Sequence, residues 1–176
     1  MSTPLSPLIH LIDDDDAVRT SLALLISTVG LRVQTWADPQ SFVQDFDRQC
    51  IGAIVLDVRM PGISGLTVLD TLQAQGVDQP VIMLTGHGTV DMCRRAFKSG
   101  ATEFLEKPVD DERLLEALQN AVRQHVKSRQ RHQTDRHDDE EHPPPAGDAE
   151  DLVGTGEQAT DQWADHGGDA EGGQEV

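Results

Sequence analysis

The 176-residue chain has few basic residues, two cysteines and no long apolar run. Its 14 lysines and arginines face 31 aspartates and glutamates, which gives a formal net charge of −17. Nucleic-acid binding needs a basic stripe, so we expect no direct binding of nucleic acid by this chain. No apolar stretch reaches membrane-spanning length, and the N-terminus lacks the pattern of a signal peptide. We therefore expect no membrane association.

The two cysteines, Cys50 and Cys93, do not have the spacing of a metal site. Two thiols also form no disulfide framework, so a reducing, cytoplasmic setting is expected. No glycine-rich loop follows the first apolar segment, which argues against a nucleotide-binding module.

The charge is distributed unevenly along the chain. Residues 1–133 carry 13 basic and 17 acidic residues, whereas residues 134–176 carry one basic and 14 acidic residues. From residue 128 onward the apolar periodicity stops, and such a composition cannot offset the entropy cost of ordering. We expect residues 128–176 to be a disordered acidic tail or linker with no recognisable output domain. It could be native, a foreign segment on a truncated protein, or an output domain read out of frame.

The preceding part of the chain repeats one unit of short apolar strand, polar loop and amphipathic helix. The predicted strands are residues 8–12, 32–36, 51–56, 81–84 and 102–105. The predicted helices are residues 15 or 16 to about 29, 39 to about 48, about 66–75, about 89–99 and about 111–127. This alternation indicates an α/β domain, a five-stranded doubly wound parallel sheet with helices on both faces. The third strand is apolar on both faces and should be central.

A polar side chain follows four of these strands. The residues are Asp13 and Asp14 after the first strand, Asp57 after the third, Thr85 after the fourth and Lys107 after the fifth. In an open parallel sheet, ligands bind at the carboxyl ends of the strands. Carboxylates, a hydroxyl and a lysine at that edge suit a hard cation and a phosphoryl group.

Asp57 is the candidate phosphoacceptor, because aspartate can form an acyl phosphate and this one ends the central strand. The carboxylates of Asp13, Asp14 and Asp57, with the backbone carbonyl of Arg59, would hold Mg2+. Lys107 would add a fixed positive charge. Each residue alone has a simpler explanation, such as a solvated loop, a turn aspartate or a surface lysine. Their occurrence together, each at the end of its strand, favours the site.

Four segments carry a resemblance to a known family: residues 12–15 (IDDD), 56–65 (LDVRMPGISG), 84–88 (LTGHG) and 104–108 (FLEKP). Residues 7–127 resemble the receiver domain of bacterial two-component response regulators, in particular the FixJ-like branch. The resemblance implies a flavodoxin-like sheet with strand order 2-1-3-4-5. It also implies a phosphorylation-dependent signalling switch, derived from a transcriptional response regulator, rather than an enzyme.

By this resemblance, Asp57 accepts a phosphoryl group from a sensor histidine kinase. Asp14 would bind Mg2+ directly and Asp13 through water, while Thr85 and Lys107 would contact the phosphoryl oxygens. Activity of its own would be limited to self-phosphorylation and autodephosphorylation.

The resemblance also implies a switch made of Thr85 and Phe104, and a cis peptide bond between Lys107 and Pro108. When Thr85 moves toward a phosphoryl group, the Phe104 ring would turn into the vacated space. This would reshape a surface of the fourth helix, fifth strand and fifth helix, where a second copy could form a homodimer. On the fourth helix we expect this patch around Met92, Arg95, Ala96 and Ser99. The alternative is a Phe104 ring that is always part of the core.

The main competing function is a phosphatase or mutase of the aspartyl-phosphate type on a similar sheet. Such enzymes typically have a second acid two residues after the nucleophile, and this chain has Arg59 there.

Overall fold

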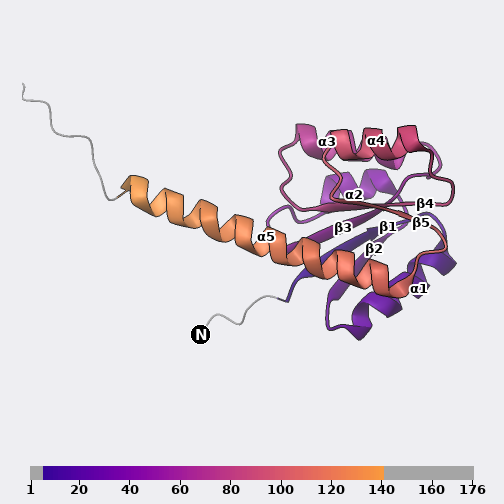
Figure 1. Cartoon of the computed structure of the whole chain (residues 1–176), viewed down its shortest axis with the longest axis horizontal. Helices are drawn as coiled ribbons and strands as arrows, with labels where there is room; N and C mark the ends of the chain where they lie inside the picture. Colours follow the sequence, from indigo (N-terminus) through magenta and orange to yellow (C-terminus); the bar gives the residue numbers. More distant parts are fainter. Residues whose placement is uncertain (1–5, 141–176) are drawn as a thin grey trace, which may run out of the picture. The chain divides into compact units, whose positions relative to one another are not determined.

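The computed structural model describes residues 6–140, with side chains described for residues 6–132. Within residues 6–140, five strands alternate with five helices (Figure 1). The strands are β1 (Leu8–Ile12), β2 (Arg32–Trp36), β3 (Gly52–Asp57), β4 (Val81–Thr85) and β5 (Glu103–Glu106). The helices are α1 (Asp16–Thr28), α2 (Pro39–Asp45), α3 (Gly65–Ala74), α4 (Val90–Lys98) and α5 (Asp111–Glu140).

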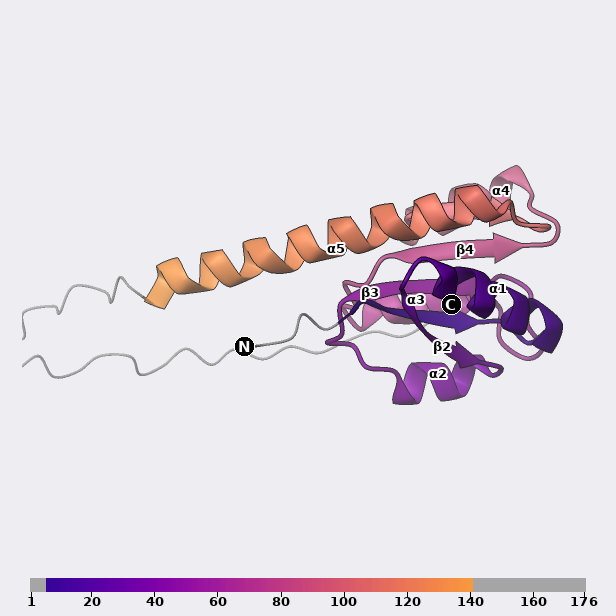
Figure 2. The same ribbon diagram turned by 90° about the horizontal axis from the view of Figure 1, so that it is seen from below.

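All strand pairs of the sheet are parallel, in the order β2-β1-β3-β4-β5, which confirms the predicted fold class. Helices α1 and α5 cover one face of the sheet, and α2, α3 and α4 cover the other (Figures 1 and 2). Each face has its own apolar core. Every residue of β3 is buried, as expected of a central strand between two helical layers.

The strand register brings the polar strand ends to one edge. Ile12 of β1 lies opposite Leu56 of β3, so the next residue of each strand meets at the same edge. Asp57 lies opposite Leu84, and Thr85 pairs with the last residue of β5. The residues that follow β1 and β5, and those that end β3 and β4, therefore converge.

Helix ends follow the signals in the sequence. The Asp15 carboxylate accepts the backbone N–H groups of Ala17 and Val18 at the start of α1. Gly30 and Gly76 follow α1 and α3 with positive φ values of 77° and 68°, a conformation that favours glycine.

Two helices end at different residues from those predicted. Helix α2 ends at Asp45 rather than near Arg48, because the backbone of the next residue, Phe46, is extended. The Phe46 ring stacks on the Phe42 ring, with 4.5 Å between the ring centroids. Helix α5 runs to Glu140 rather than to about Lys127. Extending an existing helix costs much less than nucleating one, so a polar continuation without an apolar stripe can remain helical.

The predicted disorder of residues 128–176 is wrong for residues 128–140, which continue α5; from residue 141 onward it falls outside the described residues. No helix in the described part of the chain is both long and apolar enough to cross a membrane.

Candidate functional site

Three carboxylates meet at the carboxyl edge of the sheet. Ligand oxygens of Asp13, Asp14 and Asp57 all lie within 4.8 Å of one another. Asp13 and Asp57 are buried, and Asp14 is exposed. Hard oxygen ligands at this spacing are the kind that Mg2+ prefers, so the residues present fit the predicted metal.

Lys107 joins two of these carboxylates. Its Nζ donates to Asp13 Oδ2 at 2.6 Å and lies 2.9 Å from Asp57 Oδ1. The backbone N–H of Lys107 donates to the Thr85 carbonyl at 2.7 Å, which fixes the lysine to the end of β4. The bond to Pro108 is cis, as predicted. One ammonium thus faces two buried carboxylates of a three-carboxylate cluster.

The pKa values of the cluster reflect this excess of negative charge. Burial raises the pKa of the Asp57 carboxyl; Lys107 opposes the shift, and Asp13 and Asp14 add to it. Burial alone would lower the pKa of Lys107, but its hydrogen bonds to Asp13 and Asp57 outweigh that, so the pKa is raised. A cation among the carboxylates would favour the ionised form of Asp57.

The loop after β3 is held close to Asp57. A Cβ on Gly65 would lie 2.1 Å from the Asp57 carbonyl oxygen, so only glycine allows α3 to begin this near. The backbone N–H of Gly65 and the hydroxyl of Ser64 both donate to the Val58 carbonyl, at 2.9 Å and 3.2 Å. Arg59 is exposed in this loop. A metal bond to its backbone carbonyl stays a prediction.

Thr85 and Phe104 lie in the same region. Thr85 is fully buried, and its hydroxyl accepts the His87 N–H at 3.3 Å. A Cβ on Gly88 would lie 3.0 Å from the Phe104 ring and 3.1 Å from the Thr85 methyl group. Gly88 therefore lies against both residues of the predicted switch. The ring of Phe104 is only partly buried and packs against the core.

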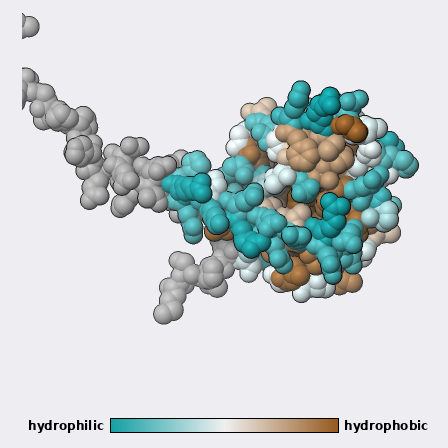
Figure 3. All heavy atoms as spheres, viewed as in Figure 1, coloured by the Kyte–Doolittle hydropathy of each residue, from teal (hydrophilic) through white to brown (hydrophobic). Residues whose placement is uncertain are grey.

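A cavity of about 530 Å³ lies between α4, β5 and α5, beside the Phe104 ring. It is lined by Gly88, Thr89, Val90, Cys93, Arg94, Phe97, Phe104, Glu106 and Arg113. Val90 and Phe97 are 76% and 47% exposed. On the face seen in Figure 3, hydrophobic atoms gather between α4 and α5.

The predicted patch on α4 is wrong in its residues. Ala96 is fully buried, and Met92 packs against the core. Arg95 and Ser99 bond to Asp70 of α3, at 3.0 Å and 2.6 Å. Arg95 and Ser99 therefore face α3, whereas Val90, Cys93, Arg94 and Phe97 are the α4 residues that line the cavity beside Phe104.

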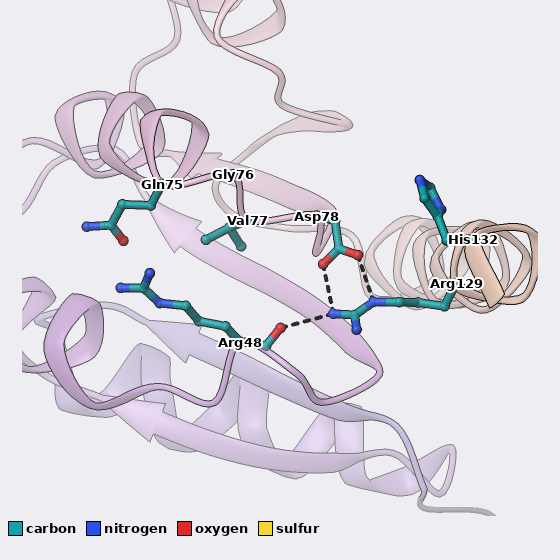
Figure 4. Close-up of a pocket in the computed structure, with 7 residues that line it drawn as sticks. All are labelled: Arg48, Gln75, Gly76, Val77, Asp78, Arg129 and His132. Carbon is teal, nitrogen blue, oxygen red and sulfur yellow. Dashed lines mark hydrogen bonds and ion pairs between the residues drawn. The ribbon is translucent and has the colours of Figure 1, made fainter. Parts of the chain in front are cut away.

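A second cavity, of about 470 Å³, lies beside the loops that precede β3 and β4 (Figure 4). Its lining includes Arg48, Asp78 and Arg129, and Arg129 pairs with Asp78 and donates to the Arg48 carbonyl. None of the predicted site residues lines it. The cavity lies where Arg129 attaches α5 to the rest of the domain, and not at the carboxylate cluster.

One contact with the cluster has no counterpart among the predicted site residues. The Arg19 guanidinium of α1 donates to the Asp13 carbonyl at 2.8 Å. The only local signal is the spacing of Arg19 from Asp16, which suits an ordinary ion pair within a helix.

Comparisons with known proteins agree with this geometry. A family model described as the response regulator receiver domain matches residues 9–119. The transcriptional regulatory protein FixJ of Azorhizobium caulinodans is 47% identical over 117 residues, which cover 65% of this chain and 54% of FixJ. The response regulator protein TodT of Pseudomonas putida is 39% identical over 115 residues, which cover 65% of this chain and 51% of TodT. The chain therefore spans about half the length of these curated relatives.

Solved structures show the same similarity. Full-length FixJ from B. japonicum has a TM-score of 0.65 and 39% identity, over 70% of this chain and 61% of FixJ. The response regulator StyR has a TM-score of 0.71 and 34% identity, over 75% of this chain and 67% of StyR. These relatives are signalling proteins rather than classical enzymes. With a family match over most of the sheet and its helices, and this level of identity, the chain belongs to the response regulator receiver domain family.

Proposed function

We propose that Asp57 accepts a phosphoryl group from a sensor histidine kinase and that this chain is a signalling switch of a two-component system. Receiver domains take phosphoryl groups from sensor kinases and bind Mg2+. The observation that carries the assignment is the position of Asp57, at the end of a buried central strand, 2.9 Å from Lys107 and within the carboxylate cluster.

In the proposed reaction a carboxylate oxygen of Asp57 attacks the phosphorus of a phosphohistidine. The new P–O bond forms as the P–N bond breaks, and the electron pair stays on the imidazole nitrogen. Asp13, Asp14, Asp57 and the Arg59 carbonyl would hold Mg2+, which when bound neutralises phosphoryl charge. Lys107 keeps its position through Thr85 and supplies positive charge beside the reacting oxygen. Thr85 would donate its hydroxyl to the transferred group.

The same site supports self-phosphorylation from small phosphodonors and autodephosphorylation, with no other turnover. We place the receiver at residues 7–127, with residues 128–140 as the continuation of α5, and regard residues 141–176 as linker or tail. The relatives named as transcriptional regulators suggest a role in transcription for the full protein, and we expect it to act in the cytoplasm.

The output surface is proposed to be the face of α4, β5 and α5. Thr85 and Phe104 both lie against Gly88, so a movement of one side chain would change the space available to the other. The exposed apolar side chains of α4 beside Phe104 give a second copy a surface to pack on. Phosphorylation would favour this homodimer.

The decisive experiment is incubation with acetyl phosphate and Mg2+, followed by intact-mass measurement. Wild-type protein should gain one phosphoryl group, and Asp57→Asn should gain none while keeping its fold. Asp47→Asn, an aspartate in an exposed loop, is the matched control and should be labelled like wild type. Normal labelling of Asp57→Asn would refute the assignment. Continued turnover of a small phosphoester would instead indicate an aspartyl-phosphate enzyme.

A further inference from the structure

One arginine holds the main chain of the acidic loop between β1 and α1. Arg19 lies in α1, and its side chain is 14% exposed. Arg19 Nη1 donates to the Asp13 carbonyl at 2.8 Å, and Nη2 donates to the Asp16 carboxylate at 2.6 Å. The first contact is to backbone, within the turn that carries the carboxylate cluster.

This contact fixes the peptide unit between Asp13 and Asp14. The backbone N–H of Asp13 donates to the Trp36 carbonyl at 3.1 Å, and its Oδ1 accepts the Asp15 N–H at 2.9 Å. Arg19 holds the remaining polar group of Asp13, its carbonyl oxygen. Because a peptide unit is planar, holding that carbonyl also sets the direction in which Asp14 leaves the strand. Asp14 is the exposed member of the cluster.

Arg19 and Lys107 act on the cluster in different ways. Lys107 bonds to the carboxylates of Asp13 and Asp57. Arg19 bonds to the Asp13 carbonyl and the Asp16 carboxylate, so it does not compete with a cation for the Asp13 and Asp14 carboxylates. As a charge alone, Arg19 would repel a nearby cation and weaken its binding. As a positioning group, it would strengthen binding. The two roles therefore predict opposite effects of removing Arg19.

We propose that Arg19 is a positioning residue for the divalent cation of this site: it preorganises the Asp13–Asp14 peptide so that both carboxylates are presented together. The proposal rests on the proposed function, because it assumes that the cluster binds Mg2+. Groups that orient metal ligands without touching the metal typically change metal affinity by about 10- to 100-fold.

The test is a titration of the Arg19→Met protein with Mg2+ alone, followed by the NMR shifts of the Asp13, Asp14 and Asp57 amides. Methionine keeps an apolar stem and removes both donors and the charge. We expect binding about 10-fold weaker than in wild type. Arg123→Met is the matched control, because Arg123 of α5 makes the same kind of contacts, to the Gln119 carbonyl and the Asn120 side chain. Its Mg2+ affinity should not change.

A second readout separates positioning from general loss of structure. In labelling with acetyl phosphate, the Mg2+ concentration for half-maximal rate should rise by about 10-fold in Arg19→Met. The rate at saturating Mg2+ should stay close to that of wild type, because Arg19 does not touch the reacting atoms. Melting of the metal-free proteins identifies any loss of fold. Arg19→Gln provides the same measurement if Arg19→Met does not fold.

Equal or tighter Mg2+ binding in Arg19→Met would overturn the proposal and leave Arg19 as a simple charge. An equal loss in Arg123→Met would also overturn it. If wild type binds Mg2+ and Asp14→Ala does not, while Arg19→Met binds normally, only this inference fails. If wild type itself does not bind Mg2+ at these amides, the proposed metal site fails, and the inference fails with it.

Discussion

Replacing Lys107 by methionine tests the electrostatic design of the carboxylate cluster. The change keeps an unbranched apolar stem and removes an ammonium that contacts Asp13 at 2.6 Å and Asp57 at 2.9 Å. Both aspartates are buried, so each would be left in a poorly solvated position without its cation. Breaking a buried ion pair from one side costs about 3–5 kcal/mol.

The expected loss of stability in Lys107→Met is at the lower end of that range or below it. The Lys107 side chain is 21% exposed, so water can replace part of its contribution. We expect the free energy of unfolding to fall by about 2–3 kcal/mol without Mg2+. For a domain of this size, that corresponds to a melting temperature lower by roughly 4–12 °C.

The loss of stability in Lys107→Met should be larger at neutral pH than at mildly acidic pH. The Asp57 pKa is already raised by burial in the wild type, so the folded state holds this proton more tightly than the unfolded chain. Stability from such a group is present below the unfolded pKa and is lost as pH rises through the folded pKa. Without Lys107 the pKa of Asp57 should rise further, because Lys107 is the cation that opposes the shift. The variant should therefore recover stability on mild acidification.

The assay is urea denaturation of wild type, Lys107→Met and Lys98→Met, at neutral and mildly acidic pH, with and without Mg2+. Lys98 is exposed on α4 and is the matched control. Mg2+ should reduce the loss in Lys107→Met, since a bound cation replaces the missing charge and stabilises the folded state by mass action. The reasoning is refuted if Lys107→Met loses no more stability than Lys98→Met, or loses the same amount at both pH values.

Millimolar Mg2+ should raise the melting temperature of wild type and leave that of Asp14→Ala nearly unchanged; a similar rise in the variant would argue against this ligand. Thr85→Ala and Phe104→Ala should weaken beryllofluoride-induced dimerisation, measured by analytical ultracentrifugation, without preventing modification; dimerisation as strong as in wild type would contradict the coupling. Gly88→Ala should lower the free energy of unfolding by about 1–2 kcal/mol, because its Cβ would press on Phe104 and Thr85. An unchanged urea midpoint would show that the Phe104 ring moves aside without cost. Deleting residues 141–176 should leave the melting transition almost unchanged, since that segment has few apolar groups; a large loss of stability would show that it docks.

Much of the site could be predicted because its residues follow strand ends. A parallel strand ends where its apolar run ends, and Asp13, Asp57 and Lys107 come at those points. The parallel sheet then brings strand ends to one edge whatever the details of packing. Local signals worked for the same reason: the Asp15 cap and the turn at Gly30 depend only on nearby backbone geometry. The sequence by itself therefore determined the fold class, the strand order implied by the resemblance and most of the cluster.

Contacts between distant segments were decided only by the tertiary structure. Helix α2 ends where Phe46 joins an aromatic group around His10, and burial in that group lowers the pKa of His10 to about 4. The Trp36 indole donates to this histidine at 3.2 Å, so a polar residue in β1 is satisfied by side-chain contacts that no local pattern indicates.

The contacts that two basic side chains make at the cluster also depend on the tertiary structure. Lys107 contacts Asp57 at 2.9 Å and Asp13 at 2.6 Å, and Asp13 lies 94 positions away in the chain. The bond from Arg19 to the Asp13 carbonyl depends on the angle at which α1 leaves the loop. Sequence patterns report burial and local hydrogen bonding, whereas the direction of each side chain follows from how helices pack on a twisted sheet.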